Sequence, residues 1–347
     1  MLANIGHERA GRRGRGGGAS PPGAPRRPRP RSRRVVPRAP RYGGRVTSPY
    51  PTGDQHELRL GAQVAVITSV GASIREYRVG DRDVVLPFAA ESLAPAFSGA
   101  VLAPWPNRIR DGVYAYRGTT YQLHLSEPPR GVAIHGLVAY ARFDVVERSD
   151  DAVTLRHDLV PTPGYPWSLR IEQTYRLTDR GLDVTTVATN LGDDVAPYGV
   201  GYHPWLSPGP GTVDECTLQV DAARHVDVDN RLLPTVTEPV AGVFDLRQPK
   251  PLKGVQLDDA WVEPIRDADG LSWVRLTGSD GRTVAMWADA TLPAWQVCTG
   301  DGLEGIQRGG VAAEPMSCIA DAFRTGDLLV ELEGGGTHEA HWGLGLI

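Results

Sequence analysis

One histidine stands in a stretch of chain that restricts its position. Residues Pro197–Leu206 place Gly199 and Gly201 before His203, and Pro204 after it. Glycine lets the backbone approach a neighbouring group closely, and proline fixes φ directly after the imidazole. A histidine held in this way suits proton transfer, because its unperturbed pKa lies near neutrality. The alternative is a histidine that only packs in a core or a turn, and the residues around His203 favour proton transfer.

Glu314 is a second candidate for proton transfer. It follows the apolar residues Val311–Ala313 and precedes Pro315. An apolar environment raises the pKa of a carboxyl group toward the range of a base that works near neutral pH. Other Glu-Pro pairs are expected to be ordinary strand ends: Glu127-Pro128, Glu238-Pro239 and Glu263-Pro264. The apolar approach, and the glycine-rich loop that we expect from Gly309 to Pro315, distinguish Glu314 from them.

Two further polar sites lie beside glycine or proline at the ends of predicted strands. Asn107-Arg108 follows Pro106, and His135 precedes Gly136. Binding and catalytic side chains favour loops that a rigid scaffold positions. We therefore expect Asn107, Arg108 and His135 to lie near His203 and Glu314.

The segments between these residues have the pattern of β-strands. Strand-like stretches cover Glu57–Val70, Ser73–Leu86, Val113–Tyr116, Thr120–Leu125, Phe143–Glu147, Ala152–Leu159, Leu169–Leu177, Gly181–Asn190, Thr217–Val228, Trp273–Leu276, Thr283–Trp287, Trp295–Thr299, Leu328–Leu332 and Thr337–Leu346. Turn residues at 178–181, 279–281 and 334–336 predict hairpins, the last one joining the final two strands. With 41 glycines, 29 prolines and no sustained helical period, the sequence predicts an all-β antiparallel sandwich. We expect one domain over residues 46–347.

The charge is distributed unevenly along the chain. Residues 1–45 hold 13 arginines and one acid, whereas the remainder has 24 basic and 40 acidic residues. The Arg/Gly/Pro-rich segment 1–45 is predicted to be disordered, because it has few apolar residues to bury. It is either an arm for RNA or a membrane surface, a dispensable tail, or upstream sequence before a start at Val46. The acidic remainder does not suit nucleic-acid binding.

Cysteine content and hydropathy limit the compartment. The three cysteines Cys216, Cys298 and Cys318 match neither a disulfide framework nor a zinc site. No apolar run is long enough to span a membrane, and the first 30 residues lack the apolar region of a secretory signal. We predict a cytoplasmic protein.

The ordered set of motifs resembles the aldose 1-epimerase (galactose mutarotase) family across residues 57–347. The matching pieces are Pro106–Ile109 with Gly112, Tyr114 and Gly118, Ile134–Gly136, Gly164–Pro166, Ala196–Pro204, Leu257–Trp261, Gln296–Gly300, and Glu314–Cys318 with Asp321–Phe323. The resemblance implies a β-supersandwich with an open sugar cleft, no metal and no cofactor. It also implies a small sugar as substrate.

The resemblance also implies a role for each matching residue. Glu314 would be the general base and His203 the general acid. Sugar hydroxyls would be bound by Arg108, His135, Asp258 and Gln296, with Asn107 in support. Because Asp258 and Asp259 are adjacent, either could be the binding carboxylate.

The residue types fit the interconversion of sugar anomers. This reaction removes a proton from the C1 hydroxyl while it protonates the ring oxygen, and a carboxylate and an imidazolium on opposite sides of one hemiacetal supply both transfers. The substrate would be a free aldohexose such as glucose or galactose, and Trp105, Trp167 and Trp205 could stack on it. The alternatives are a hexose 6-phosphate, with Arg110, Arg130 and Arg142 as available cations, or a non-catalytic carbohydrate-binding protein. We expect a monomer or a homodimer.

Overall fold

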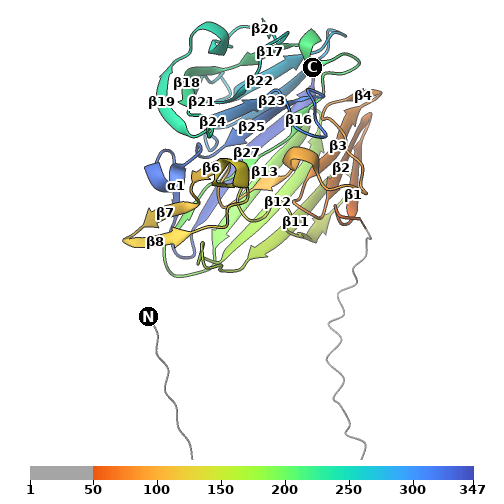
Figure 1. The fold of residues 1–347 in the computed structure, drawn as a ribbon. Coiled ribbons are helices and arrows are strands. Elements are labelled where there is room, and N and C mark those ends of the chain that lie inside the picture. Colours follow the sequence, from red (N-terminus) through yellow and green to blue (C-terminus); the bar gives the residue numbers. More distant parts are fainter. Residues whose placement is uncertain (1–49) are drawn as a thin grey trace, which may run out of the picture. The chain divides into compact units, whose positions relative to one another are not determined.

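Antiparallel β-sheets form most of the computed structural model, which describes residues 50–347 (Figure 1). The predicted all-β antiparallel class is confirmed, because every pairing between the named strands of this part is antiparallel. The disorder predicted for residues 1–45 falls outside the described residues. None of the helices within 50–347 is long and apolar enough to cross a membrane.

The larger of the two main sheets has nine strands. In spatial order they are β10 (Asp144–Arg148), β11 (Ala152–Leu159), β12 (Leu169–Thr178), β13 (Gly181–Asn190), β27 (Thr337–Leu346), β23 (Thr283–Ala288), β22 (Ser272–Thr277), β17 (Thr217–Val220) and β20 (Lys250–Pro251). Side chains of β12 alternate between buried and partly exposed, with Leu169, Ile171 and Tyr175 fully buried. This alternation shows that one face of the sheet covers the core.

The second main sheet carries the residues of interest. Its order is β19 (Pro234–Pro239), β18 (Ala222–Val228), β21 (Asp258–Pro264), β24 (Ala294–Cys298), β25 (Val311–Met316), β15 (Gly201–Tyr202) and β5 (Val101–Leu102), with β16 (Trp205–Leu206) also paired to β25. Every residue of β24 and β25 is buried. These central strands are therefore covered on both faces.

Side chains join the two main sheets through the core. Trp295 of β24 donates its indole N–H to Ser272 Oγ of β22 at 3.0 Å. The hydroxyl groups of Tyr202 on β15 and Thr186 on β13 form a second link. Both links are buried, so each satisfies polar atoms that water cannot reach.

Smaller sheets and short helices complete the fold. One sheet contains β1 (Gln55–Leu60), β2 (Gln63–Thr68), β3 (Ile74–Val79) and β4 (Arg82–Asp83). Three two-stranded sheets pair β6 (Arg108–Arg110) with β9 (Val132–Ile134), β7 (Val113–Tyr116) with β8 (Thr119–Gln122), and β14 (Ala196–Tyr198) with β26 (Val330–Leu332). The helical segments are α1 (Ala322–Thr325) and the 3₁₀ turns Pro95–Phe97, Pro128–Arg130, Val213–Glu215 and Gly242–Phe244.

One predicted hairpin and one predicted strand are wrong. The hairpin expected through residues 334–336 does not form, because β26 pairs with β14 while β27 lies between β13 and β23. The stretch predicted as one strand over Thr217–Val228 is two strands in different sheets, separated at Asp221. The Asp221 carboxylate binds Arg275 at 2.8 Å, and its carbonyl oxygen accepts the Ser272 hydroxyl proton. Alternation identifies a strand but not its partner, so neither connection could be read from the pattern.

Candidate active site

Backbone contacts on both sides hold His203 between β15 and β16. Its N–H donates to the Ala100 carbonyl oxygen at 3.1 Å, and its own carbonyl oxygen accepts from the Gly99 N–H at 2.8 Å. A Cβ atom at Gly201 would lie 2.7 Å from Cβ of Pro106, so the close approach before His203 requires glycine there. The imidazole is consequently buried in a fixed position.

Glu314 lies in the middle of β25, so the loop expected around it is wrong. Gln296 of β24 lies directly opposite Glu314 in the ladder, and Asp258 of β21 lies opposite Cys298. Residues opposite each other, or two apart on one strand, share a face of the sheet. This register brings Asp258, Gln296, Cys298 and Glu314 to the same face.

A short ribbon of two strands presents Asn107 and His135. Arg108 of β6 pairs with Ile134 of β9, so Asn107 and His135 lie together just beyond the paired residues. Both adopt a left-handed backbone, with φ of 54° and 61°. The His135 N–H donates to the Asn107 carbonyl oxygen at 2.9 Å, and the Asn107 N–H donates to His135 Nδ1 at 3.2 Å. Because Nδ1 accepts this bond, the proton of neutral His135 is on Nε2.

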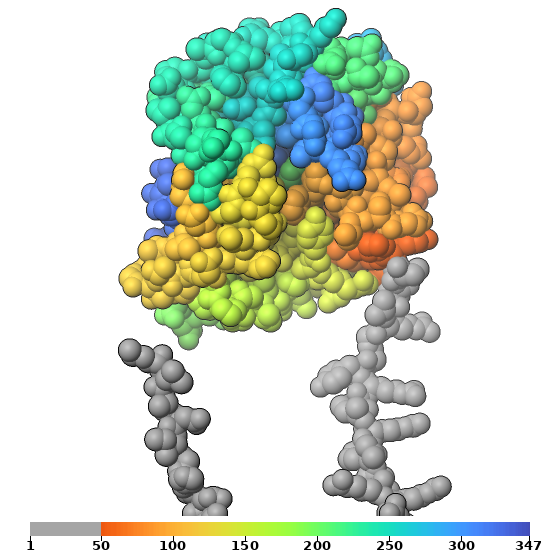
Figure 2. All heavy atoms as spheres, viewed as in Figure 1, coloured from red at the N-terminus to blue at the C-terminus, as the bar shows by residue number. Residues whose placement is uncertain are grey.

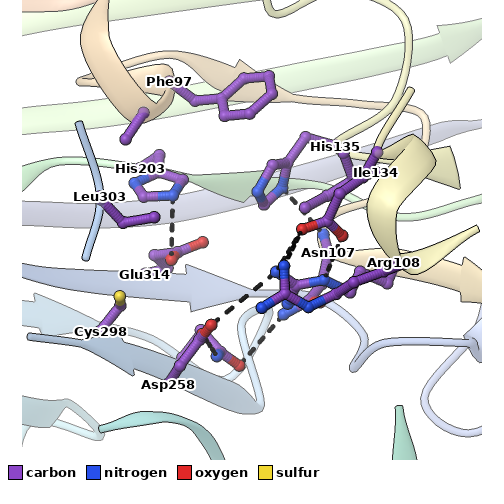
Figure 3. A pocket seen from close by; sticks show the side chains of 14 residues that line it. Phe97, Asn107, Arg108, Ile134, His135, His203, Asp258, Cys298, Leu303 and Glu314 are labelled. Atoms are coloured by element: carbon purple, nitrogen blue, oxygen red, sulfur yellow. Dashed lines mark hydrogen bonds and ion pairs between the residues drawn. The ribbon is translucent and has the colours of Figure 1, made fainter. Parts of the chain in front are cut away.

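These elements enclose one pocket of about 160 Å³. Its lining consists of Ala96, Phe97, Asn107, Arg108, Glu127, Arg130, Ile134, His135, His203, Asp258, Gln296, Cys298, Leu303 and Glu314 (Figure 3). Orange, yellow and blue segments that contribute to the lining meet around a hollow in the surface (Figure 2), and the green and teal parts of the chain contribute His203 and Asp258. The two predicted proton-transfer residues and the five predicted sugar-binding residues, with Asp258 and not Asp259 among them, all line this pocket.

His203 and Glu314 lie next to each other, with His203 Nε2 3.4 Å from Glu314 Oε1 (Figure 3). The expectation that they lie on opposite sides of one hemiacetal is wrong, because a separation of 3.4 Å leaves no room for the hemiacetal group between them. The two oxygens of a hemiacetal share one carbon atom, so adjacent groups can each reach one of them. His203 Nδ1 and Glu314 Oε2 are buried without a hydrogen-bond partner among residues 50–347.

Burial shifts the pKa of each group in the direction that favours its neutral form. It lowers the pKa of His203 to about 3, and the nearby Arg108 charge acts in the same direction. Burial also raises the pKa of Glu314 well above its ordinary value; the Asp258 carboxylate adds to this rise and Arg108 opposes it. Burial lowers the pKa of His135 strongly, with smaller contributions from His203 and Arg108.

A hydrogen-bonded chain connects the polar residues on the other side of the pocket. Asn107 Nδ2 donates to Gln296 Oε1 at 3.1 Å, and Gln296 Nε2 donates to Asp258 Oδ1 at 2.8 Å. Arg108 Nη2 lies 3.9 Å from Asp258 Oδ2. These contacts hold the amides and the carboxylate in place along the pocket wall.

The structure separates the two adjacent aspartates. Asp258 lines the pocket, whereas Asp259 Oδ1 lies 3.0 Å from His225 Nε2 outside it. His225 also lies 3.0 Å from Asp227 through Nδ1 and stacks on Phe244. Consecutive residues of a strand face opposite sides, which is why only Asp258 faces the pocket.

Several lining residues were missed or misjudged from the sequence. Glu127, predicted to be an ordinary strand end, binds Arg108 Nε through Oε2 at 2.8 Å. The charged pair around Pro128-Pro129, Glu127 and Arg130, was the available signal for this part of the pocket. Phe97 ends the 3₁₀ turn Pro95–Phe97 and Leu303 lies in a loop, and neither segment carries a comparable pattern; Phe97 packs edge-on against His135.

The tryptophans proposed to stack on a sugar do not line the pocket. Trp105, Trp167 and Trp205 are buried in the core. Trp205 instead stacks on the His203 ring, with 5.5 Å between centroids, and donates its indole N–H to the Ala96 carbonyl oxygen.

Of the arginines considered for a phosphate, Arg130 alone lines the pocket. Arg110 pairs with Asp229 and Asp321, and Arg142 pairs with Asp54.

Comparison with known proteins identifies the family to which the chain belongs. A family model described as aldose 1-epimerase matches residues 54–344. The uncharacterized protein YihR of Escherichia coli K12 is 35% identical over 297 residues, covering 84% of this chain and 93% of that protein.

Two solved structures share the fold. The GalM/aldose epimerase homologue from C. elegans has a TM-score of 0.74 at 20% identity and covers 85% of this chain and 99% of its own. A galactose mutarotase-like protein from Clostridium acetobutylicum has a TM-score of 0.74 at 16% identity, covering 84% and 94%. The family match and the YihR relationship both extend over most of the chain, which therefore belongs to the aldose 1-epimerase family.

Proposed function

We propose that this protein is an aldose 1-epimerase that interconverts the α- and β-anomers of a free aldohexose such as glucose or galactose. The observation that carries the proposal is the buried pair of His203 and Glu314, 3.4 Å apart, in a pocket whose other polar groups can bind hydroxyls. A carbohydrate-binding protein without activity has no use for two adjacent proton-transfer groups buried at the expense of stability.

The pair supplies both proton transfers of the reaction. Glu314 removes the proton from the C1 hydroxyl, and His203 delivers a proton to the ring oxygen. The bond between C1 and the ring oxygen breaks, and C1 becomes an aldehyde. Rotation about the C1–C2 bond and the reverse transfers close the ring with the opposite configuration. Each transfer contributes on the order of 10²–10⁴-fold in rate, and the scheme needs no metal or cofactor.

The proton balance of the reaction is compatible with the pKa directions of His203 and Glu314. Neutral His203 with protonated Glu314 carries the same number of protons as imidazolium with carboxylate. Proton transfer from Glu314 Oε1 to His203 Nε2 over their 3.4 Å separation converts one state into the other without exchange with solvent. A sugar hydroxyl that donates a hydrogen bond to the Glu314 carboxylate would favour the charged state, because such a bond lowers the pKa of a carboxyl group.

The remaining polar residues fit the binding of hydroxyl groups. Neutral His135 presents its Nε2–H, and Arg108 presents N–H donors. The Asp258 carboxylate and the Gln296 amide add acceptors and donors. Charge-assisted bonds of this kind are stronger than bonds between neutral groups. We propose that these residues, with Asn107 in support, hold the sugar with C1 at the His203–Glu314 pair.

Arg130 favours a second candidate, a hexose 6-phosphate as substrate. Its guanidinium lines the pocket, as a phosphate site would require. However, Arg130 Nη1 lies 2.7 Å from Glu127 Oε1, and the same carboxylate pairs with Arg108. Because this carboxylate offsets positive charge and repels a dianion, the pocket favours an uncharged sugar.

Polarimetry and NMR anomeric exchange test the proposal. Wild-type protein is expected to accelerate equilibration of fresh α-glucose or α-galactose, and to do so more than for glucose 6-phosphate. Glu314→Gln is expected to lower kcat by at least about 100-fold with little change in fold. A wild-type protein that binds sugars without changing the rate would make it a carbohydrate-binding protein, and an unaffected variant would remove Glu314 as the base.

A further inference from the structure

We propose that Glu127 is a positioning residue that holds the Arg108 guanidinium in its sugar-binding orientation. This proposal rests on the function proposed above. It concerns a Glu-Pro pair that the sequence predicted to be an ordinary strand end.

Glu127 occupies one edge of the guanidinium. Its Oε2 accepts from Arg108 Nε at 2.8 Å, and its Oε1 accepts from Arg108 Nη2 at 3.3 Å. Two parallel bonds of this kind fix the plane of an arginine side chain. The other terminal nitrogen, Nη1, contacts Asn107 Oδ1 at 3.4 Å, so Glu127 leaves this nitrogen on the side of Asn107.

Charge balance gives Glu127 a second effect on the pocket. The Arg108 side chain is only 9% exposed, so its positive charge needs compensation. Burial acts to lower the pKa of Arg108, but the Glu127 hydrogen bond and the Asp258 and Glu127 carboxylates raise it overall. Arg108 itself lowers the pKa of His203, His135 and Glu314. The Glu127 carboxylate thus partly offsets the Arg108 charge that lowers the pKa values of His203 and Glu314.

The Glu127 carboxylate is not needed for the turn in which it lies. Glu127 precedes the 3₁₀ turn Pro128–Arg130, but its side chain makes no capping hydrogen bond there. The turn is closed by backbone bonds, from the Arg130 N–H to the Glu127 carbonyl oxygen and between Glu127 and Val132. A salt bridge from Arg130 Nη1 to Glu127 Oε1, at 2.7 Å, also restrains the carboxylate, and the same oxygen accepts from Arg108 Nη2. The contacts of the Glu127 carboxylate are therefore with Arg108 and Arg130.

A double-mutant cycle with Arg108 tests this role. Glu127→Gln is expected to raise KM for the hexose about 10-fold, with a smaller change in kcat, because Arg108 loses its orientation. It should also move the apparent pKa values of kcat/KM downward, since a negative charge near the site is removed. In an Arg108→Gln background the same substitution is expected to change KM less than about 2-fold, because its effect acts through Arg108.

Glu263→Gln is the matched control. Glu263 also precedes a proline, but its side chain is 66% exposed and its partner, Arg224, is 3.7 Å away. This variant should leave KM and the pH profile unchanged. If Glu127→Gln does not fold, Glu127→Asp takes its place, with a smaller rise in KM in the same direction.

The outcomes separate the positioning role from the proposed function. Equal effects of Glu127→Gln with and without Arg108 would overturn the positioning role, as would an unchanged KM and pH profile. Failure of the wild-type protein to accelerate anomeric exchange would refute the enzymatic function instead. In that case titration calorimetry with glucose or galactose decides the role of Glu127. It is carried out on the wild type, Glu127→Gln, Arg108→Gln and the double variant, and Glu127→Gln should weaken binding only where Arg108 is present.

Discussion

Burial determines the protonation of the two central side chains. Glu314 is 2% exposed and His203 6% exposed, so each pays a desolvation penalty in its charged form. In an ordinary core such groups would be selected against, because they destabilise the fold when they ionise. Their position side by side in a pocket agrees with a use for the reactivity that burial creates.

Glu314→Gln is expected to stabilise the protein as pH rises. The folded pKa of Glu314 lies above its ordinary value of 4.5, so its contribution to stability is fully present below pH 4.5 and lost as pH rises through the folded pKa. Glutamine has a similar shape and does not ionise. Thermal unfolding should therefore show little difference at pH 4 and a higher Tm for the variant, by a few degrees, at pH 8. A Tm difference that is independent of pH would contradict the raised pKa.

Sequence reasoning identified the residue types of the site better than their arrangement. His203, Glu314, Arg108 and His135 were marked by neighbouring glycine or proline and by the ordered motifs. The family resemblance alone suggested Gln296, which has no such neighbour. The adjacency of His203 and Glu314 depends on the ladder between β24, β25 and β16, and sequence patterns do not specify such contacts.

At the scale of elements, the register of β25 and the ribbon of β6 and β9 position the pocket. The ribbon meets the rest of the fold at Gly136, which follows His135. A Cβ atom there would lie 2.1 Å from the Ala103 carbonyl oxygen, and φ is +71°. The glycine is thus required by both the backbone conformation and the space.

Gly136→Ala is expected to reduce stability far more than Gly118→Ala. Gly118 also has a positive φ, of +80°, but nothing lies within 4 Å of its Cβ position. The backbone cost of about 1–2 kcal/mol is therefore common to both variants, and only Gly136→Ala adds a steric clash. Urea unfolding measures the difference, and equal losses of stability would show that Ala103 yields without cost.

Strand limits could be predicted from local sequence patterns, whereas the pairing of strands that are distant in the sequence could not. Strands β11, β13 and β27 were predicted with their observed limits, because alternation and turn residues mark them. The partner of β27 is β13 and not the preceding strand, so the last predicted hairpin was wrong. Pro315 lies inside β25, whereas the glycine-rich stretch that begins at Gly309 and ends at this proline predicted a loop around Glu314.

At the scale of the whole molecule, buried histidines link stability to acid pH. Burial lowers the pKa of His56, His135, His203 and His338 below the ordinary value of 6.5. An unfolded chain takes up protons at these positions that the folded protein excludes. Stability is therefore present above pH 6.5 and is lost as pH falls toward the folded pKa values, which is about 3 for His203.

Replacement of one of these histidines should weaken this pH dependence. We expect the free energy of unfolding of His203→Gln to fall less steeply between pH 6.5 and pH 4 than that of the wild-type protein. Urea titrations at several pH values measure both slopes, with the exposed His124 as the control position. Identical slopes for wild type and His203→Gln would contradict the lowered pKa, because they would mean that His203 takes up its proton equally in the folded and unfolded states.

Anomeric exchange measured by NMR on wild type, His203→Gln, Glu314→Gln and the double variant tests the central claim most directly. If the two side chains work as one unit on a single hemiacetal, each single substitution lowers the exchange rate at least about 100-fold, and the double variant is little slower than the slower single variant. The account would be contradicted if the rate losses of the two single variants multiplied in the double variant. It would also be contradicted if neither substitution slowed the exchange.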